Sequence, residues 1–87
     1  MNRYIRRPEL ISASLDDDLV MLDIELGKYF SLNPVAARIW ELLEEAQTAE
    51  SLCILLQEEY EVTEDQCLSE TSRLLEEMVS IKLLTRL

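Results

Sequence analysis

The sequence predicts a single α+β domain in which a three-stranded antiparallel sheet precedes three helices, an order that suits a winged-helix-like fold. Residues 19–25 alternate between apolar and polar side chains, as in a half-buried strand. The only glycine, Gly27, separates this segment from a second strand-like segment. From Asn33 onward the apolar residues recur with helical spacing, and the connections are too short for anything but compact packing.

The sheet is expected to begin with a short strand at residues 9–14, followed by an acidic turn at residues 16–18. The next strand, residues 19–25, places Val20 and Leu22 on one face and Met21 and Asp23 on the other. Glycine adopts positive φ at little cost, so Leu26-Gly27 predicts a hairpin turn. The chain then returns as a strand at residues 28–32, which we expect near the edge of the sheet.

The first helix is expected over residues 34–46, because Asn33 is a favourable N-cap and proline is well tolerated at the first helical position. Thr48 is the next N-cap, and the amphipathic pattern after it predicts a second helix that extends to about residue 60.

Thr63 is followed three residues later by Gln66, a spacing typical of a capping box. A third helix is therefore expected over residues 63–81, and Leu83 and Leu84 are expected to fold back onto the core. The whole chain, residues 1–87, is interpreted as one domain, in which residues 1–8 form a flexible basic arm.

The charge distribution argues against a nucleic-acid-binding protein. The net charge is −10, and residues 8–81 contain all 18 acidic residues but only three of the eight basic ones. Phosphate binding requires the opposite sign, because neutralisation of phosphates supplies most of the affinity for nucleic acid.

The composition also argues against an enzyme. The chain has no histidine, which is the commonest general base, and a single glycine, which excludes a glycine-rich phosphate loop. Cys53 and Cys67 lie within helical patterns and form no CxxC motif, so they are interpreted as reduced thiols in the core, with a redox role as the alternative. We expect no catalytic residues, metal or cofactor, and a cytoplasmic location without a membrane-spanning segment or signal peptide.

Taken together, the order and spacing of these segments resemble the PqqD-like family of peptide chaperones, also called precursor-peptide recognition elements. The similarity covers roughly residues 8–84 and rests on these segments: Gly27, Tyr29-Phe30-Ser31-Leu32-Asn33, Ile39-Trp40, Thr48, Tyr60-Glu61-Val62 and Leu83-Leu84. The resemblance implies a domain that binds the leader segment of a ribosomally synthesised precursor peptide and presents that peptide to another enzyme.

The resemblance is strongest to the freestanding recognition subunit of lasso-peptide systems, which implies a separate leader protease and a cyclase as partners. The branch that serves quinone-cofactor synthesis, with a radical enzyme as partner, is similar in size. Residues 45–47 read Glu-Ala-Gln, where that branch typically has an Asp-Gly turn, and this favours the lasso type. Lys82 stands where many relatives have a glycine that ends the third helix.

The resemblance implies that the leader pairs as an extra strand on residues 28–32 and lies against the third helix. The backbone of this strand would supply hydrogen bonds, and side-chain pockets would supply specificity. The expected peptide-binding residues are Lys28, Tyr29, Phe30, Ser31 and Leu32 on the strand and Cys67, Glu70, Thr71, Arg73, Leu74 and Met78 on the helix. Glu70 and Glu77 would attract a basic leader residue, whereas Arg73 or Lys28 would hold an acidic one.

Two other interpretations stay open at this point. Several of the helical positions are also compatible with a purely structural role, because a Leu/Met stripe on a helix usually faces the core. The chain could also be an acidic winged-helix adaptor that docks onto another protein and has no part in peptide maturation.

Overall fold

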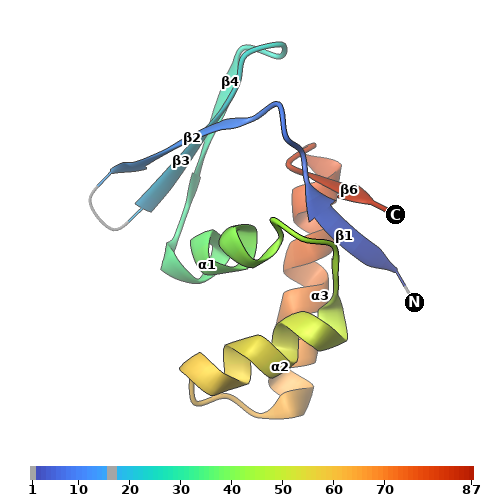
Figure 1. The fold of residues 1–87 in the computed structure, drawn as a ribbon. Helices are drawn as coiled ribbons and strands as arrows, with labels where there is room; N and C mark the ends of the chain where they lie inside the picture. Colours follow the sequence, from blue (N-terminus) through green and yellow to red (C-terminus); the bar gives the residue numbers. More distant parts are fainter. Residues whose placement is uncertain (1, 16–17) are drawn as a thin grey trace.

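The computed structural model describes residues 2–15 and 18–87 and has the expected α+β architecture (Figure 1). A three-stranded antiparallel sheet has the order β2-β3-β4. Its strands are β2 (Ile11–Leu15), β3 (Asp18–Asp23) and β4 (Lys28–Leu32), and the helices are α1 (Pro34–Leu42), α2 (Ala49–Glu59) and α3 (Glu64–Ser80). Of the expected acidic turn, residues 16 and 17 lie outside the described residues, and Asp18 already belongs to β3.

The hairpin between β3 and β4 turns at Gly27, as predicted, but the turn begins earlier than the sequence indicated. In the antiparallel register Met21 lies opposite Phe30 and Asp23 lies opposite Lys28. Gly27 has φ 63°, in the left-handed region that glycine tolerates best. The carboxylate of Asp23 accepts a hydrogen bond from the backbone N–H of Leu26 at 3.1 Å, so β3 ends at Asp23.

The buried face of this sheet is the one that carries Met21 and Asp23, which are 0% and 4% exposed. The opposite face presents an apolar row across all three strands, because Ile11 pairs with Leu22 and Leu22 pairs with Tyr29. These three side chains are 51%, 40% and 75% exposed. An aspartate therefore lies on the buried face, where it has polar partners, and several large apolar side chains face the solvent.

Residues 3–6 form a strand, so the expectation of a flexible arm over residues 1–8 is wrong for this part. A second antiparallel sheet has the order β5-β1-β6, with β1 (Arg3–Arg6), β5 (Gln47–Thr48) and β6 (Leu84–Arg86). Tyr4 is only 6% exposed, and its hydroxyl donates a hydrogen bond to the Glu76 carboxylate at 2.8 Å. Burial of this ring fixes β1 against α3 and accounts for the order of the segment.

The three predicted N-caps are present, but the capping box predicted at Thr63 and Gln66 forms only in its Thr63 half. Asn33 caps α1 by accepting a hydrogen bond from the N–H of Ala36 at 2.9 Å. At the start of α2, Thr48 and Ser51 form a reciprocal capping box. The hydroxyl of Thr63 accepts the N–H of Gln66 at 3.2 Å at the start of α3.

α1 is shorter than the expected 34–46, because it ends at Leu42. The carbonyl of the next residue, Leu43, accepts a hydrogen bond from the backbone N–H of Arg6 at 3.2 Å. After α1 the chain therefore runs alongside β1, the central strand of the second sheet. This hydrogen bond joins residues far apart in the sequence, so the local sequence does not predict it.

The end of α3 has the hydrogen bonds of a Schellman motif. The N–H of Leu83 donates to the carbonyl of Met78 at 2.9 Å, and the N–H of Lys82 donates to the carbonyl of Val79 at 3.0 Å. Lys82 has φ 66° and therefore occupies the left-handed position that is usually a glycine. Leu83 and Leu84 then return to the core, as predicted, with exposures of 0% and 3%.

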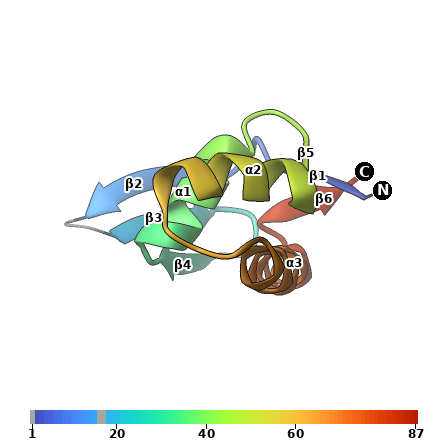
Figure 2. The same ribbon diagram turned by 90° about the horizontal axis from the view of Figure 1, so that it is seen from below.

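The core lies between the helices and the two sheets, which occupy opposite ends of the helical layer (Figure 2). Every helix contributes to it, as do β3 and the segment after α3. Its largest fully buried side chains are Met21, Ile39, Leu43, Leu52, Leu75, Met78 and Leu83. Trp40 is 3% exposed, and the Arg6 guanidinium lies over its ring, 5.4 Å from the ring centroid. Among the described residues, no helix has the length and hydropathy needed to span a membrane.

Candidate peptide-binding site

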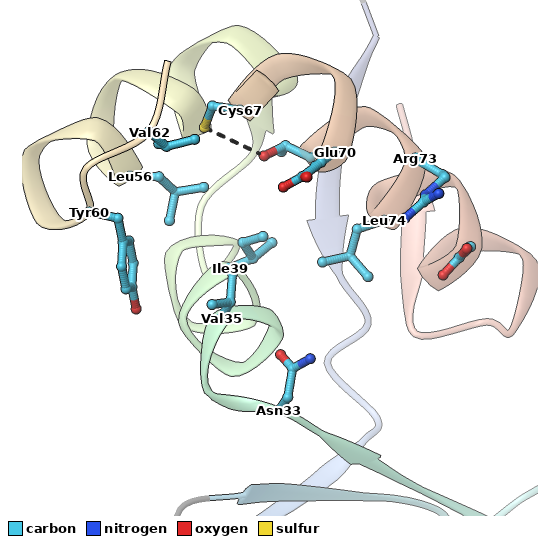
Figure 3. A pocket seen from close by; sticks show the side chains of 12 residues that line it. Asn33, Val35, Ile39, Leu56, Tyr60, Val62, Cys67, Glu70, Arg73 and Leu74 are labelled. Carbon is cyan, nitrogen blue, oxygen red and sulfur yellow. Dashed lines mark hydrogen bonds between the residues drawn. The ribbon is translucent and has the colours of Figure 1, made fainter. Parts of the chain in front are cut away.

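A groove opens beside the end of β4, between α1, the end of α2 and α3 (Figure 3). Its volume is about 480 Å³. We call it the α1–α3 groove and define it by the residues that line it: Asn33, Val35, Ile39, Leu56, Tyr60, Val62, Cys67, Glu70, Thr71, Arg73, Leu74 and Glu77. Asn33 directly follows β4 and caps α1, so the groove begins where the strand ends.

The interior of the α1–α3 groove is apolar. Ile39 and Leu56 form its floor and are 1% and 3% exposed. Val35 and Tyr60 are 46% and 41% exposed, although each lines this hollow. Figure 3 shows Val35, Ile39 and Leu74 directed into the space between α1 and α3, with Tyr60 on the other side of α1. A site with this lining suits an apolar side chain of a ligand.

The second component of the site is the free edge of β4. This strand pairs with β3 on one side and is the last strand in the described sheet, so no described strand covers its other side. Such an edge presents backbone N–H and C=O groups that can pair with another extended chain. Lys28, Tyr29 and Ser31 are exposed, Phe30 is half-buried and Leu32 is buried.

Charged side chains stand along the α3 side of the groove. Glu70, Arg73 and Glu77 are all exposed. The Glu70 carboxylate accepts a hydrogen bond from the Gln66 amide at 3.3 Å. The groove thus combines an apolar interior with a row of alternating charges on one flank.

Behind the groove, two thiols face one another between α2 and α3. The Sγ of Cys67 lies 3.9 Å from the Thr71 hydroxyl (Figure 3), and both residues are buried. Burial, together with a hydrogen bond to Cys67, raises the pKa of the Cys53 thiol from 9.0 to about 11. The Cys53 thiol therefore stays protonated at neutral pH. Both cysteines are free and buried, and they pack as small apolar side chains.

An ion pair links the two helices that form the other wall. The Arg38 guanidinium on α1 donates to both carboxylate oxygens of Glu59, at the end of α2, at distances of 2.8 to 3.0 Å. These hydrogen bonds lower the pKa of Glu59. The bidentate geometry makes this a directional contact between α1 and α2.

The structure brings together five of the six expected helix residues. Cys67, Glu70, Thr71, Arg73 and Leu74 line the groove, although Cys67 and Thr71 are largely buried in its wall. Met78 is 1% exposed and belongs to the core, so it does not line the groove. The expected strand residues form the β4 edge next to the groove and are not part of its lining.

Sequence reasoning missed the α1 and α2 side of the groove. The residues not expected there are Asn33, Val35, Ile39, Leu56, Tyr60 and Val62. Ile39, Leu56 and Tyr60 fit the amphipathic patterns of the first two helices, and these patterns give no sign that the helices separate at one end. The only feature of the sequence that could have indicated this side of the groove is the position of Val35 and Tyr60 near helix ends.

Comparisons with known proteins place the chain in a family. The sequence family described as "Coenzyme PQQ synthesis protein D (PqqD)" matches residues 18–84. No curated protein sequence gives a significant match. One similar solved structure is described as "TbiB1 in Complex with the TbiA(beta) Leader Peptide", with a TM-score of 0.82, 31% identity and coverage of 92% of this chain and 93% of that one.

A second solved structure is described as "Lasso peptide synthetase B1 complexed with the leader peptide". It is similar with a TM-score of 0.82 and 27% identity over 94% of this chain and 96% of that chain. These matches confirm the resemblance on which the sequence interpretation relied. They extend across the sheet, the three helices and the α1–α3 groove, and the chain belongs to the PqqD family.

Proposed function

We propose that this protein binds the leader segment of a ribosomally synthesised precursor peptide by adding it as a fourth strand to β4. The observation that carries the proposal is the free β4 edge beside an apolar groove that begins where the strand ends. The two similar structures support it, because each is described as a complex with a leader peptide.

Two kinds of contact would share the work of binding. Backbone groups of residues 28–32 would form hydrogen bonds with a leader strand of almost any sequence. Specificity would then come from the α1–α3 groove, where an apolar leader side chain would displace water from Leu74 and Val35. Phe30 and Leu32 would support the strand from the core side, and Tyr29 would remain on the outer face of the sheet.

The bound peptide would be presented to a separate leader protease or another modifying enzyme, with lasso-peptide maturation as the favoured setting. The similarity to a chain described as lasso peptide synthetase B1 supports this setting. The PqqD family consists of non-catalytic binding domains, so the chemistry belongs to the partner.

The proposal is tested by fluorescence titration of the full chain with the labelled leader of the precursor peptide encoded beside its gene. We expect a dissociation constant of about 10 μM or below, and no binding at tens of micromolar would contradict the proposal. Leu74→Glu, which places a charge in the groove, should weaken binding about tenfold or more.

Ile54→Glu is the matched control for the titration, because Ile54 is 63% exposed on α2 and does not line the groove. This variant should bind the leader as the wild type does, and circular dichroism should show both variants folded. Hydrogen exchange adds a test of the binding mode. The leader should slow exchange of amides in β4, and unchanged β4 exchange in the saturated complex would contradict strand addition.

A further inference from the structure

The charge row on α3 contains a guanidinium without a partner. Most arginines in the described chain are engaged: Arg7 with Asp23, Arg38 with Glu59, Arg86 with Glu76, and Arg6 over the Trp40 ring. Arg73, by contrast, has neither an ion pair nor a side-chain hydrogen bond within the described residues, although it is the basic residue of the α1–α3 groove.

The lack of an ion pair at Arg73 is informative, because two glutamates on the same helix are spaced so that they could pair with it. Glu70 precedes Arg73 by three residues and Glu77 follows it by four, and side chains at these spacings are neighbours on a helix. Neither carboxylate lies within ion-pair distance of Arg73 in the described structure. Its guanidinium therefore stands at the flank of an apolar groove with its donors available (Figure 3).

A carboxylate is the group that best complements this guanidinium. The planar fork of N–H donors matches the two oxygens of a carboxylate, and this geometry makes a strong, directional pair. A peptide lying in the groove would also exclude water from one side of Arg73, which strengthens a charge-assisted hydrogen bond.

The neighbouring glutamates restrict where acidic residues are tolerated. Glu70 and Glu77 stand about one helical turn on either side of Arg73, at axial distances of about 4.5 Å and about 6 Å. A second leader carboxylate near either of them would be repelled. The row thus favours one acidic residue, with neutral or basic residues at the positions beside it.

We propose that Arg73 reads a single aspartate or glutamate in the bound leader, and that Glu70 and Glu77 exclude acidic residues from the positions next to it. This inference rests on the proposed function, since it concerns the peptide that occupies the α1–α3 groove. In this proposal Arg73 selects leaders by their charge, and the apolar lining of the groove selects them by the shape of an apolar side chain.

The test is a selection of displayed random 20-residue peptides with three full-length proteins: wild type, Arg73→Glu and Arg3→Glu. Arg3 is exposed on β1 and does not line the groove, so its substitution is a control with the same change in net charge. Wild type and Arg3→Glu should enrich peptides with one acidic position flanked by positions poor in acidic residues. Arg73→Glu should enrich lysine or arginine at that position.

A selected peptide then supplies the binding measurement. Replacing its acidic residue by the corresponding amide should weaken binding to wild type about tenfold and leave binding to Arg73→Gln unchanged. An acidic preference that persists in Arg73→Glu, or is absent in the wild type, overturns the inference while the proposed function stands. Failure of all three folded proteins to recover any peptide overturns both.

Discussion

Lys82 shows how one residue can end a helix at the expense of stability. It adopts φ 66° at the position after the C-cap of α3, where the Schellman motif of α3 requires a left-handed backbone. A side chain with a Cβ is strained in this region by roughly 1–2 kcal/mol, whereas glycine is not. The chain tolerates the strain because the turn brings Leu83 and Leu84 into the core.

Lys82→Gly should therefore stabilise the protein by about 0.5–1 kcal/mol, since relief of strain exceeds the added freedom of glycine in the unfolded chain. Urea unfolding at neutral pH measures the change. Lys82→Ala is the matched control, because it removes the same charge but keeps a Cβ, and it should leave stability nearly unchanged. Equal stability of the glycine and alanine variants would show that the left-handed backbone carries no strain.

The helical pattern of α3 predicted some of the groove residues correctly and one of them wrongly. The spacing of three and four along α3 placed Cys67, Glu70, Thr71 and Leu74 in one row, and all four line the groove. The same stripe included Met78, which is buried because it lies near the C-terminal end of α3, where the core closes. Periodicity specifies the direction of a side chain but not where along a helix the core gives way to a groove.

At the level of elements, the contact between α2 and α3 includes the buried thiol of Cys53, which is neutral at pH 7. Cys53 on α2 faces Cys67 on α3, and burial raises the pKa of Cys53 to about 11. The pKa of Tyr4 is raised as well, by burial and by its hydrogen bond to Glu76. Both groups hold their protons more tightly in the folded state than in the unfolded state.

Stability should therefore decline as the pH rises above 9, the ordinary pKa of the thiol, and the decline should continue through the folded-state pKa of about 11. In this range the unfolded state has lost the Cys53 proton and the folded state has kept it. Urea unfolding under reducing conditions at about pH 8.5 and about pH 10.5 measures the loss. Cys53→Ala should lose less over the same interval, and an equal loss in this variant would exclude a contribution from Cys53.

The elements themselves were largely predictable where local signals marked them. The caps Asn33, Thr48 and Thr63 identified the three helix starts, and Gly27 located the hairpin that ends in β4. β1, β5 and β6 were missed because each is short and is stabilised by partners far along the chain. Residues 3–6 are ordered because Tyr4 packs against α3. This contact could not be predicted from the local sequence, which is rich in arginine.

For the molecule as a whole, Arg7 joins parts that are distant in the sequence. Its guanidinium lies 3.7 Å from the Asp23 carboxylate at the end of β3 and donates to the Lys82 carbonyl after α3 at 3.0 Å. Asp23 is 4% exposed, so Arg7 compensates a buried charge. The contact connects the sheet that carries β4 with the sheet that carries both ends of the described chain.

Arg7→Met should destabilise the protein by about 2–4 kcal/mol, because it leaves the Asp23 carboxylate buried without a counter-charge. Asp23→Asn introduced into this variant should recover part of the loss, since the amide oxygen still accepts the Leu26 N–H. In the wild-type background the same Asp23→Asn change should destabilise. Urea unfolding of the four proteins forms a double-mutant cycle, and additive effects would refute a specific Arg7–Asp23 interaction.

The pairing of β1 with β6 also determines how the domain can be joined to other proteins. Tyr4 lies opposite Arg86, and the N–H of Leu87 donates to the Arg3 carbonyl at 2.8 Å, so the two ends emerge side by side (Figure 1). They emerge from the end of the helical layer opposite β2, β3 and β4 (Figure 2). A polypeptide fused to either terminus would start on the far side of the molecule from β4. A fusion at either terminus should therefore leave the free edge of β4 accessible.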